Sequence, residues 1–116
     1  MTLHFILPGR PVGKQRARRG AGGHWYTPAP TRRYEAALLA SALAVRGAST
    51  TTITGPCTVE VVYCRGDNRR ADGDNVLKAA QDSLRGVIYH DDSQVTKAVV
   101  ERMEDGHPRT EVTVRW

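Results

Sequence analysis

Hydrophobic and polar residues alternate in four segments of the chain, as they do in β-strands that bury one face. These segments are residues 2–7, 57–64, 94–103 and 109–116. In the first of them, Leu3, Phe5 and Leu7 share one face, and a Pro-Gly pair ends the run. The sequence EDGHP separates the last two segments, and its Asp-Gly pair predicts a β-hairpin there.

Two further segments carry apolar residues at the spacing of an amphipathic α-helix. The apolar positions are Tyr34, Leu38, Ala42 and Val45 in residues 32–47, and Val76, Leu77, Ala80 and Leu84 in residues 71–86. Thr31 is the expected N-cap of the first helix, and a glycine closes each helix. The order β-α-β-α-β-β predicts an α+β fold: one domain over residues 1–116, with a mixed sheet and two packed helices.

The predicted loop between the first strand and the first helix, residues 10–30, is strongly basic. The chain has a formal charge of +5, and no acidic residue lies between Arg10 and Arg33. Arginine-rich composition alone could equally follow from a GC-rich genome, but this clustering favours a partly flexible loop that binds nucleic acid. The residues expected to contact phosphates are Lys14, Arg16, Arg18 and Arg19. Trp25 or Tyr26 either stacks on an unpaired base or folds back on the core.

The second predicted helix begins with two carboxylates, Asp72 and Asp74, separated by a glycine that allows a tight turn. Lys78 and Asp82 follow Asp74 at intervals of four residues, so the three side chains form a charged stripe beside the apolar one. One interpretation is structural, namely a helix N-cap followed by an ordinary surface ion pair. The other interpretation is a functional site, toward which the preceding arginines would steer a DNA backbone. These arginines are Arg69 and Arg70.

A second acidic pair, Asp91 and Asp92, comes shortly before the segment 94–103. In an extended backbone their side chains would point in opposite directions, so one of them is expected to face the carboxylates at the helix start. Carboxylates that converge from different elements commonly hold Mg²⁺. The residues do not fit an EF-hand calcium loop, because Leu77 and Ser83 stand where that motif needs Gly and Glu. A basic surface around an acidic cluster suits a metal-dependent nuclease, in which Lys78 would stabilise the charge of the transition state.

The segment RRADGDNVLKAAQDSLRGVIYHDDSQV resembles the signature of the RusA-like Holliday junction resolvases, a family of bacterial and phage endonucleases. The shared pattern is Asp-x-Asp-Asn, a lysine four residues after the second aspartate, Asp-Ser-Leu, and later Asp-Asp-x-Gln-Val. The upstream segment GKQRARRGAGGHWYTPAPTRRYEAAL and the final PRTEVTV are similar to phage members. Gly73 departs from the pattern, because larger side chains are common at that position.

The resemblance implies that Asp72, Asp74 and Asp92 are the catalytic, metal-binding carboxylates, with Asp91 as a neighbour, and that Lys78 is the catalytic cation. It implies Mg²⁺ as cofactor, with Mn²⁺ as a substitute. It also implies a homodimer that resolves four-way junctions by paired nicks in recombination and repair. The expected location is the cytoplasm of a bacterium or of the bacterial host of a phage.

Other classes of protein match the sequence less well. No glycine-rich phosphate loop followed by lysine occurs, so a nucleotide cofactor is not expected. No transmembrane run or signal peptide is apparent, so no membrane partner is expected. Cys57 and Cys64 lie in one predicted strand, about 23 Å apart at ~3.3 Å per residue, and so cannot bridge each other. The alternatives are a non-catalytic protein that binds junctions or DNA and keeps the fold, and a nuclease that acts on structured RNA.

Overall fold

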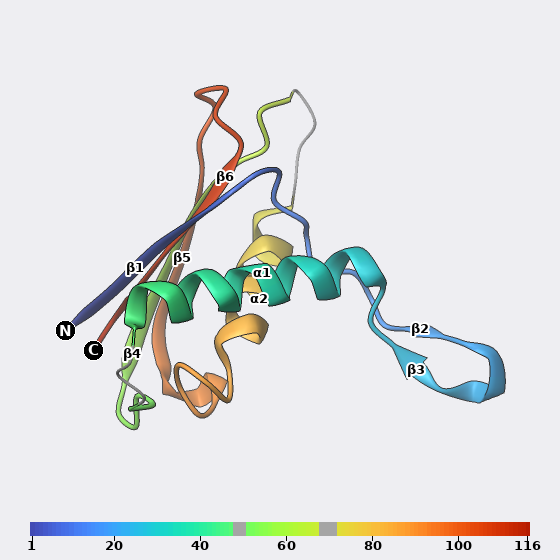
Figure 1. Ribbon diagram of the computed structural model, residues 1–116, viewed down its shortest axis with the longest axis horizontal. Coiled ribbons are helices and arrows are strands. Elements are labelled where there is room, and N and C mark those ends of the chain that lie inside the picture. Colours follow the sequence, from blue (N-terminus) through green and yellow to red (C-terminus); the bar gives the residue numbers. More distant parts are fainter. Residues whose placement is uncertain (48–50, 68–71) are drawn as a thin grey trace.

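A four-stranded sheet in the order β1-β6-β4-β5 forms the centre of the computed structural model, which describes residues 1–47, 51–67 and 72–116. The strands are β1 (Thr2–Pro8), β4 (Cys57–Cys64), β5 (Val95–Arg102) and β6 (Arg109–Arg115). Strand β6 runs antiparallel to both β1 and β4, whereas β5 runs parallel to β4. Helices α1 (Ala29–Arg46) and α2 (Gly73–Leu84) lie on one face of this sheet (Figure 1). The predicted α+β fold with a mixed sheet and two helices is therefore confirmed.

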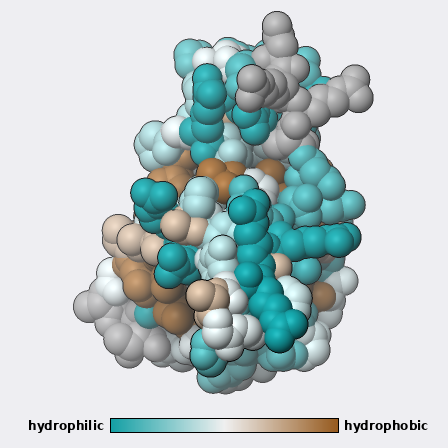
Figure 2. Space-filling model, turned by 90° about the vertical axis from the view of Figure 1, so that its right-hand side faces the viewer, coloured by the Kyte–Doolittle hydropathy of each residue, from teal (hydrophilic) through white to brown (hydrophobic). Residues whose placement is uncertain are grey.

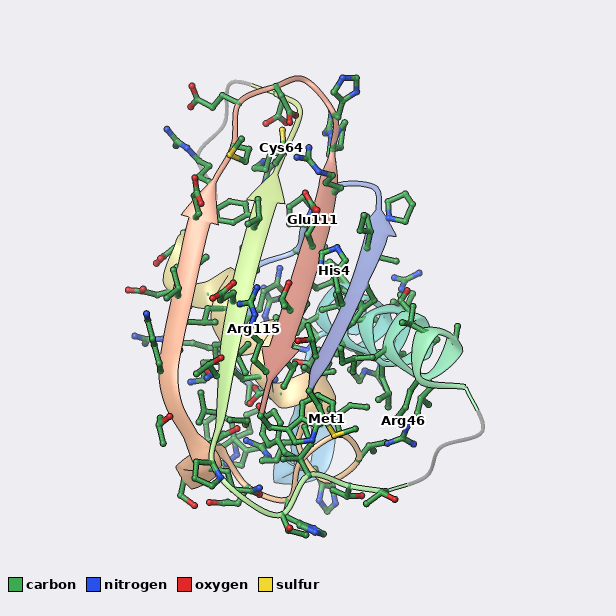
Figure 3. The ribbon with its side chains drawn as sticks, turned by 90° about the vertical axis from the view of Figure 1, so that its left-hand side faces the viewer. Met1, His4, Arg46, Cys64, Glu111 and Arg115 are labelled. Atoms are coloured by element: carbon green, nitrogen blue, oxygen red, sulfur yellow. The ribbon has the colours of Figure 1, made fainter. Side chains whose placement is uncertain are left out.

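The hydrophobic core lies between the sheet and the two helices. Phe5, Val112 and Val61 form one row across β1, β6 and β4, and all three side chains are buried. The row packs against the apolar stripes of the helices, where Leu38 and Leu84 are fully buried. The alternation and the helical spacing in the sequence therefore identify the core face of β1, β4, β6 and α2. In α1 the predicted stripe is buried at Tyr34, Leu38 and Ala42, but Val45 is exposed. The opposite face of the sheet carries no helix, and its side chains are polar for the most part (Figure 3).

The predicted hairpin between the last two strands is wrong. Strand β4 lies between β5 and β6, so these two strands do not pair. Gly106 does adopt a positive φ of 78° in the connecting turn, but the chain passes over the end of β4 there. Burial explains the arrangement, because β6 alternates between buried and half-buried residues whereas β5 has no buried residue. The strand without a buried residue, β5, lies at an edge, and β6, with three buried residues, lies inside the sheet.

The expected N-cap at Thr31 is also wrong. Helix α1 begins at Ala29 with Pro28 as N-cap, and Pro30 occupies the first turn, where its fixed φ and missing N–H are tolerated. Thr31 is fully buried in that turn, and its hydroxyl has no hydrogen-bond partner among the described residues. The predicted C-terminal glycine of this helix is confirmed, since Gly47 is the C-cap of α1 and has a φ of 68°.

The segment between β1 and α1 forms an arm, which we call the basic arm and define as residues 15–27. It contains a short two-stranded ribbon of β2 (Arg18–Arg19) and β3 (Trp25–Tyr26), joined by the 3₁₀ turn η1 (Ala21–Gly23). The arm projects from the body of the protein, away from the sheet (Figure 1). The free thiols of Cys57 and Cys64 are buried at opposite ends of β4, as expected. In the three described ranges, every helix is too short or too polar to cross a membrane.

Candidate active site

Helix α2 begins at the first acidic pair. Asp72 is the N-cap: its Oδ1 accepts a hydrogen bond of 3.0 Å from the backbone N–H of Asp74, and its Oδ2 accepts one of 3.3 Å from Asn75 Nδ2. The structural interpretation therefore holds for Asp72. Asp74 and Lys78 are different, because both are exposed and the side chain of neither has a hydrogen-bond or ion-pair partner in the described part of the chain. Asp72 and Asp74 thus share one exposed helical turn, with an ammonium group one turn further along.

Gly73 is needed for close packing rather than for an unusual backbone angle. Its φ is not positive, so a tight left-handed turn is not the reason for glycine here. A Cβ at this position would lie 3.3 Å from the hydroxyl of Tyr63 and 3.4 Å from Cγ1 of Val100. The first turn of α2 therefore rests on β4 and β5, which holds the acidic pair at the edge of the sheet.

The second acidic pair begins the short 3₁₀ helix η2 (Asp92–Gln94). Asp91 is its N-cap and accepts a hydrogen bond of 3.0 Å from the N–H of Ser93. The side chain of Ser93, followed by its backbone N–H, lowers the pKa of the Asp91 carboxyl. Asp92 Oδ2 accepts a hydrogen bond of 2.8 Å from Arg85 Nη1, and its Oδ1 lies 3.3 Å from the hydroxyl of Tyr89. Burial, followed by the charge of Asp92, raises the pKa of Tyr89, so its hydroxyl stays protonated. Asp92 is thus held as an ion-paired carboxylate.

Lys14, at the base of the basic arm, connects the two helices. Its Nζ lies 2.7 Å from Glu35 Oε1 on α1 and 3.1 Å from Asp82 Oδ2 on α2. Its backbone N–H also donates to the carbonyl of Asn75, in the first turn of α2. Burial acts to lower the pKa of Lys14, but its hydrogen bonds and ion pairs with Glu35 and Asp82 outweigh burial and raise it. Contact of Lys14 with a phosphate stays a prediction, and these contacts give the residue a structural role.

The three carboxylates expected to share one ion do not lie together: Asp72 and Asp74 are at the start of α2, and Asp92 is in η2, near the other end of that helix. Asp82 and Asp92 both accept from Arg85 Nη1 at the end of the helix. Asp74 lies eight residues before Asp82, which is about 12 Å along a helix axis at ~1.5 Å per residue. No group of three Asp, Glu, His or Cys side chains within the described residues could hold a metal ion. A single chain in this conformation therefore presents Asp72 and Asp74 at one place and Asp92 at another.

The basic arm presents its cations and aromatic rings to solvent. Arg18 faces Tyr26 and Arg19 faces Trp25 across the ribbon, and both aromatic side chains are exposed, Trp25 by 69% and Tyr26 by 47%. The alternative that these rings fold back on the core is therefore wrong. Arg16, Arg18 and Arg19 have no ion-pair partner among the described residues, and the face from which the arm projects is largely hydrophilic (Figure 2). Arg69 and Arg70 lie outside the described residues.

Comparison with known proteins identifies the family. The family model described as "Endodeoxyribonuclease RusA" matches residues 8–115 of this chain. The chain belongs to the RusA endodeoxyribonuclease family. Its sequence is also similar to the "Uncharacterized protein YqaN" of Bacillus subtilis (strain 168), with 29% identity over 139 residues that cover 97% of this chain and 95% of that protein. Membership of the RusA family implies an endodeoxyribonuclease, and it agrees with the resemblance seen in the sequence.

The donor atoms at the start of α2 suit Mg²⁺, the ion expected from the sequence resemblance. Mg²⁺ prefers carboxylate oxygens and is commonly bound through one or two carboxylates, with waters and phosphate oxygens as the remaining ligands. Asp74 has both carboxylate oxygens free of partners in the described chain, and Asp72 is adjacent. The turn therefore fits Mg²⁺ chemically, with room for a phosphate because the residues are exposed.

Sequence reasoning missed the residues that hold Asp92 and Lys14 in place. They are Glu35, Arg85 and Tyr89, together with the role of Asp82, which the sequence indicated only as a member of the charged stripe. The available signal was the continuation of the Asp74, Lys78, Asp82 stripe, since Arg85 follows Asp82 at a spacing of three. No helical spacing indicated the contact of Glu35 with Lys14, because the two residues meet only where the base of the arm crosses both helices.

Proposed function

We propose that the protein is a Mg²⁺-dependent, structure-selective endodeoxyribonuclease that resolves Holliday junctions or related branched DNA by paired phosphodiester hydrolysis. The observation that carries the proposal is the exposed group of Asp72, Asp74 and Lys78 at the start of α2, in a chain of the RusA family. Asp74 and Lys78 make no internal contact in the described chain that would account for their charges. Charges without internal partners on a rigid helix favour a role with a substrate.

The acidic turn would hold the metal through Asp72 and Asp74. When bound there, Mg²⁺ would activate a water molecule and neutralise charge on the scissile phosphate. Water adds to phosphorus, the bond from phosphorus to the 3′ oxygen breaks, and that oxygen takes up a proton, so the ends are a 5′ phosphate and a 3′ hydroxyl that can be ligated. Lys78 supplies a fixed positive charge for the pentacovalent transition state, one turn from Asp74.

Asp92 is proposed as a third metal ligand, and Asp91 as a neighbour of the site. Because Arg85 and Tyr89 contact Asp92, its recruitment requires Arg85 to release it. A DNA phosphate offers Arg85 an alternative anion, so substrate binding and release of Asp92 can be coupled. Mn²⁺ would replace Mg²⁺ because it accepts the same oxygen ligands.

The basic arm would bind the branched DNA. Arg16, Arg18 and Arg19 are free to contact phosphates, and the adjacent ring of Tyr26 or Trp25 can stack on an unpaired base at the branch point. Arg69 and Arg70 are proposed to steer the backbone toward the acidic turn. Cleavage of two strands at symmetric positions requires two active sites related by a two-fold axis, so we propose a homodimer. Its proposed location is the cytoplasm of a bacterium or phage-infected cell.

Cleavage of a labelled four-way junction tests this proposal. The protein is incubated with the junction with and without Mg²⁺, and the products are mapped on a denaturing gel. The proposal predicts nicks at symmetric positions in two opposing strands, only when the metal is present, and ligation of the products without further treatment. Junction that stays intact in Mg²⁺ and in Mn²⁺ would overturn it, and cleavage of structured RNA alone would point to an RNA-directed nuclease.

A non-catalytic protein that binds junctions is the second candidate. The separation of Asp92 from Asp72 and Asp74 in this conformation favours it, because a binding protein does not need the three carboxylates at one ion. The free charges of Asp74 and Lys78 count against it, since a carboxylate without a metal repels DNA. A band shift without nicked product at any metal concentration would select this candidate.

A further inference from the structure

The basic arm leaves the body of the protein at a sharp boundary on each of its two legs. Lys14 is half-buried, whereas all five residues from Gln15 to Arg19 are exposed. On the return leg Pro28 is buried, and Thr27 is the one residue between it and strand β3. Because an extended chain spans at most about 3.6 Å per residue, this leg has little slack.

The first attachment point of the arm lies on the helical turn that carries the acidic pair. The backbone N–H of Lys14 donates to the carbonyl of Asn75 over 3.0 Å. A Cβ on Gly13 would lie 3.3 Å from Cβ of Asn75, so the two backbone segments are in close contact here. Asn75 also donates from Nδ2 to Asp72 Oδ2 over 3.3 Å. One residue therefore contacts both the base of the arm and a carboxylate of the acidic pair.

The second attachment point is the start of helix α1. Pro28 is the N-cap of this helix and Pro30 lies in its first turn, and the ring of each proline fixes its φ angle. Lys14 joins the two attachment points, because its Nζ lies 2.7 Å from Glu35 on α1 and 3.1 Å from Asp82 on α2. Both legs of the arm are therefore fixed to the layer of helices that carries the acidic turn.

The arm itself is a hydrogen-bonded ribbon. Strands β2 and β3 pair along both of their residues, and just beyond them the N–H of Gly20 donates to the carbonyl of His24 over 2.8 Å. The ring of Tyr26 packs on Gly20, where a Cβ would lie 3.2 Å from Cε1 of that ring. The guanidinium of Arg19 packs in the same way on Gly23, with 3.2 Å to Nη2. Side chains of the arm thus have defined positions relative to its base.

We propose that the basic arm is a molecular ruler, which sets the distance between the branch point that the arm holds and the phosphate that is cleaved at the acidic turn. Both ends of this distance lie on one frame, since the base of the arm is fixed to the turn of Asp72 and Asp74. Each residue adds ~3.3 Å to a strand, and successive phosphates of a DNA strand lie ~3.4 Å apart along the duplex axis. Two more residues in each leg therefore correspond to a cut about two nucleotides further from the branch point. The ruler rests on the proposed function, because it fixes the position of the cut that the nuclease makes.

Insertions in the arm test the ruler through the position of the cut. The test variant carries two threonines after Ala17 and two after Tyr26, which extends the ribbon by two facing pairs and keeps every side chain on its original face. The control is a tip variant with the same four threonines between Ala21 and Gly22, beyond the paired strands. Both are incubated in Mg²⁺ with immobile four-way junctions of several sequences, which separates a preference for position from a preference for sequence.

The test variant should cut about two nucleotides further from the branch point than the wild type, on every junction that both cleave. The tip variant should cut at the wild-type phosphates, because its insertion lies beyond the ribbon. Two glycines in place of each pair of threonines add the same length with a flexible backbone, and should spread the cuts over several phosphates. Wild-type cut positions in the test variant would overturn the ruler and leave the nuclease function intact.

A chemical probe at the acidic turn keeps the test independent of cleavage by the protein. An iron chelate attached to Lys78→Cys, in a chain that also carries Asp74→Asn, cuts by radicals the nucleotides nearest to the start of α2. Cys57 and Cys64 are buried, so the chelate attaches selectively to the introduced thiol. The radical cuts should move by about two nucleotides in the test variant and stay in place in the tip variant.

The two readouts separate the ruler from the nuclease function. If the radical cuts move although the wild type leaves the junction intact, the nuclease function fails and the ruler stands. Radical cuts that do not move in the test variant, or a wild type that does not bind the junction, would overturn the ruler.

Discussion

Replacement of Lys14 by methionine tests the interpretation of the arm base as a structural clamp. Methionine keeps the aliphatic stem but removes the ammonium that joins Glu35 to Asp82. The three side chains are only 20%, 19% and 13% exposed, in the order Lys14, Glu35 and Asp82, so the loss leaves two shielded carboxylates near each other. Breaking a fully buried pair costs roughly 3–5 kcal/mol. Partial exposure and the remaining contact of Asp82 with Arg85 reduce the expected loss in the free energy of unfolding to about 2 kcal/mol.

This loss corresponds to a fall in Tm of about 8 °C, at an unfolding entropy of ~2.1 cal/mol/K per residue. The pKa of Lys14 is raised in the folded state above its ordinary value of 10.5. The stabilisation that this ammonium gives is therefore complete below pH 10.5, and it is lost as the pH rises through the pKa of the folded state. The difference in the free energy of unfolding between wild type and Lys14→Met should therefore be constant from neutral pH to about pH 9 and shrink above pH 10.5.

Urea unfolding of the wild type, Lys14→Met and Arg18→Met measures the effect. Arg18 is an exposed cation on the same arm without a partner in the described chain, and its replacement should change stability by less than about 0.5 kcal/mol. If Lys14→Met lowers the free energy of unfolding by less than about 0.5 kcal/mol, the ion pairs of Lys14 do not have the structural role assigned to them. The same variant separates structure from DNA contact, because loss of a phosphate contact lowers the slope of log K against log salt by ~0.9 and loss of an internal clamp does not.

Three other substitutions test the DNA contacts of the basic arm and the buried hydroxyl of α1. Arg18→Ala should reduce the slope of junction affinity against salt by about 0.9, measured by fluorescence anisotropy, and an unchanged slope would exclude a phosphate contact. Trp25→Ala should weaken binding of a branched DNA by roughly 1–3 kcal/mol while binding of uniform duplex changes little, and equal losses on both would contradict stacking at the branch point. Thr31→Val replaces a buried hydroxyl that lacks a partner in the described chain, so it should leave thermal stability unchanged or raise it by up to about 1 kcal/mol. A loss above 1 kcal/mol would show that this hydroxyl makes a stabilising contact.

Local patterns in the sequence predicted the elements because the buried residues of most elements recur with the period of a strand or a helix. Strand β5 is the exception, since it has no buried residue. Phe5 and Val61 lie in the core as the alternation required, and Val76, Ala80 and Leu84 of the α2 stripe are fully buried, with Leu77 half-buried. The pairing of strands was less predictable. The Asp-Gly turn before β6 suggested a hairpin, but the exposed β5 and the more buried β6 take opposite sides of β4, and that choice depends on the whole sheet.

The candidate site was predictable where it depends on one helix. Asp72, Asp74 and Lys78 share the start of α2, as their spacing indicates. The position of Asp92 was not predictable, because it is set by contacts with Arg85 and Tyr89 from the turn that follows α2. The internal use of Lys14 was hidden for a similar reason, since its partners lie 21 and 68 positions further along the chain.

The most direct test of the central claim is junction cleavage by Asp74→Asn in Mg²⁺, measured together with junction binding. Asparagine keeps the size and the helix but removes a charge that has no internal partner in the described chain, so the fold should be unaffected. Glu104→Gln, which removes a carboxylate far along the chain from α2, is the control for net charge. The account predicts at least a hundredfold slower cleavage for Asp74→Asn, which is about 2.7 kcal/mol of lost transition-state stabilisation, with junction binding equal or tighter. Cleavage at the wild-type rate with binding intact would contradict it.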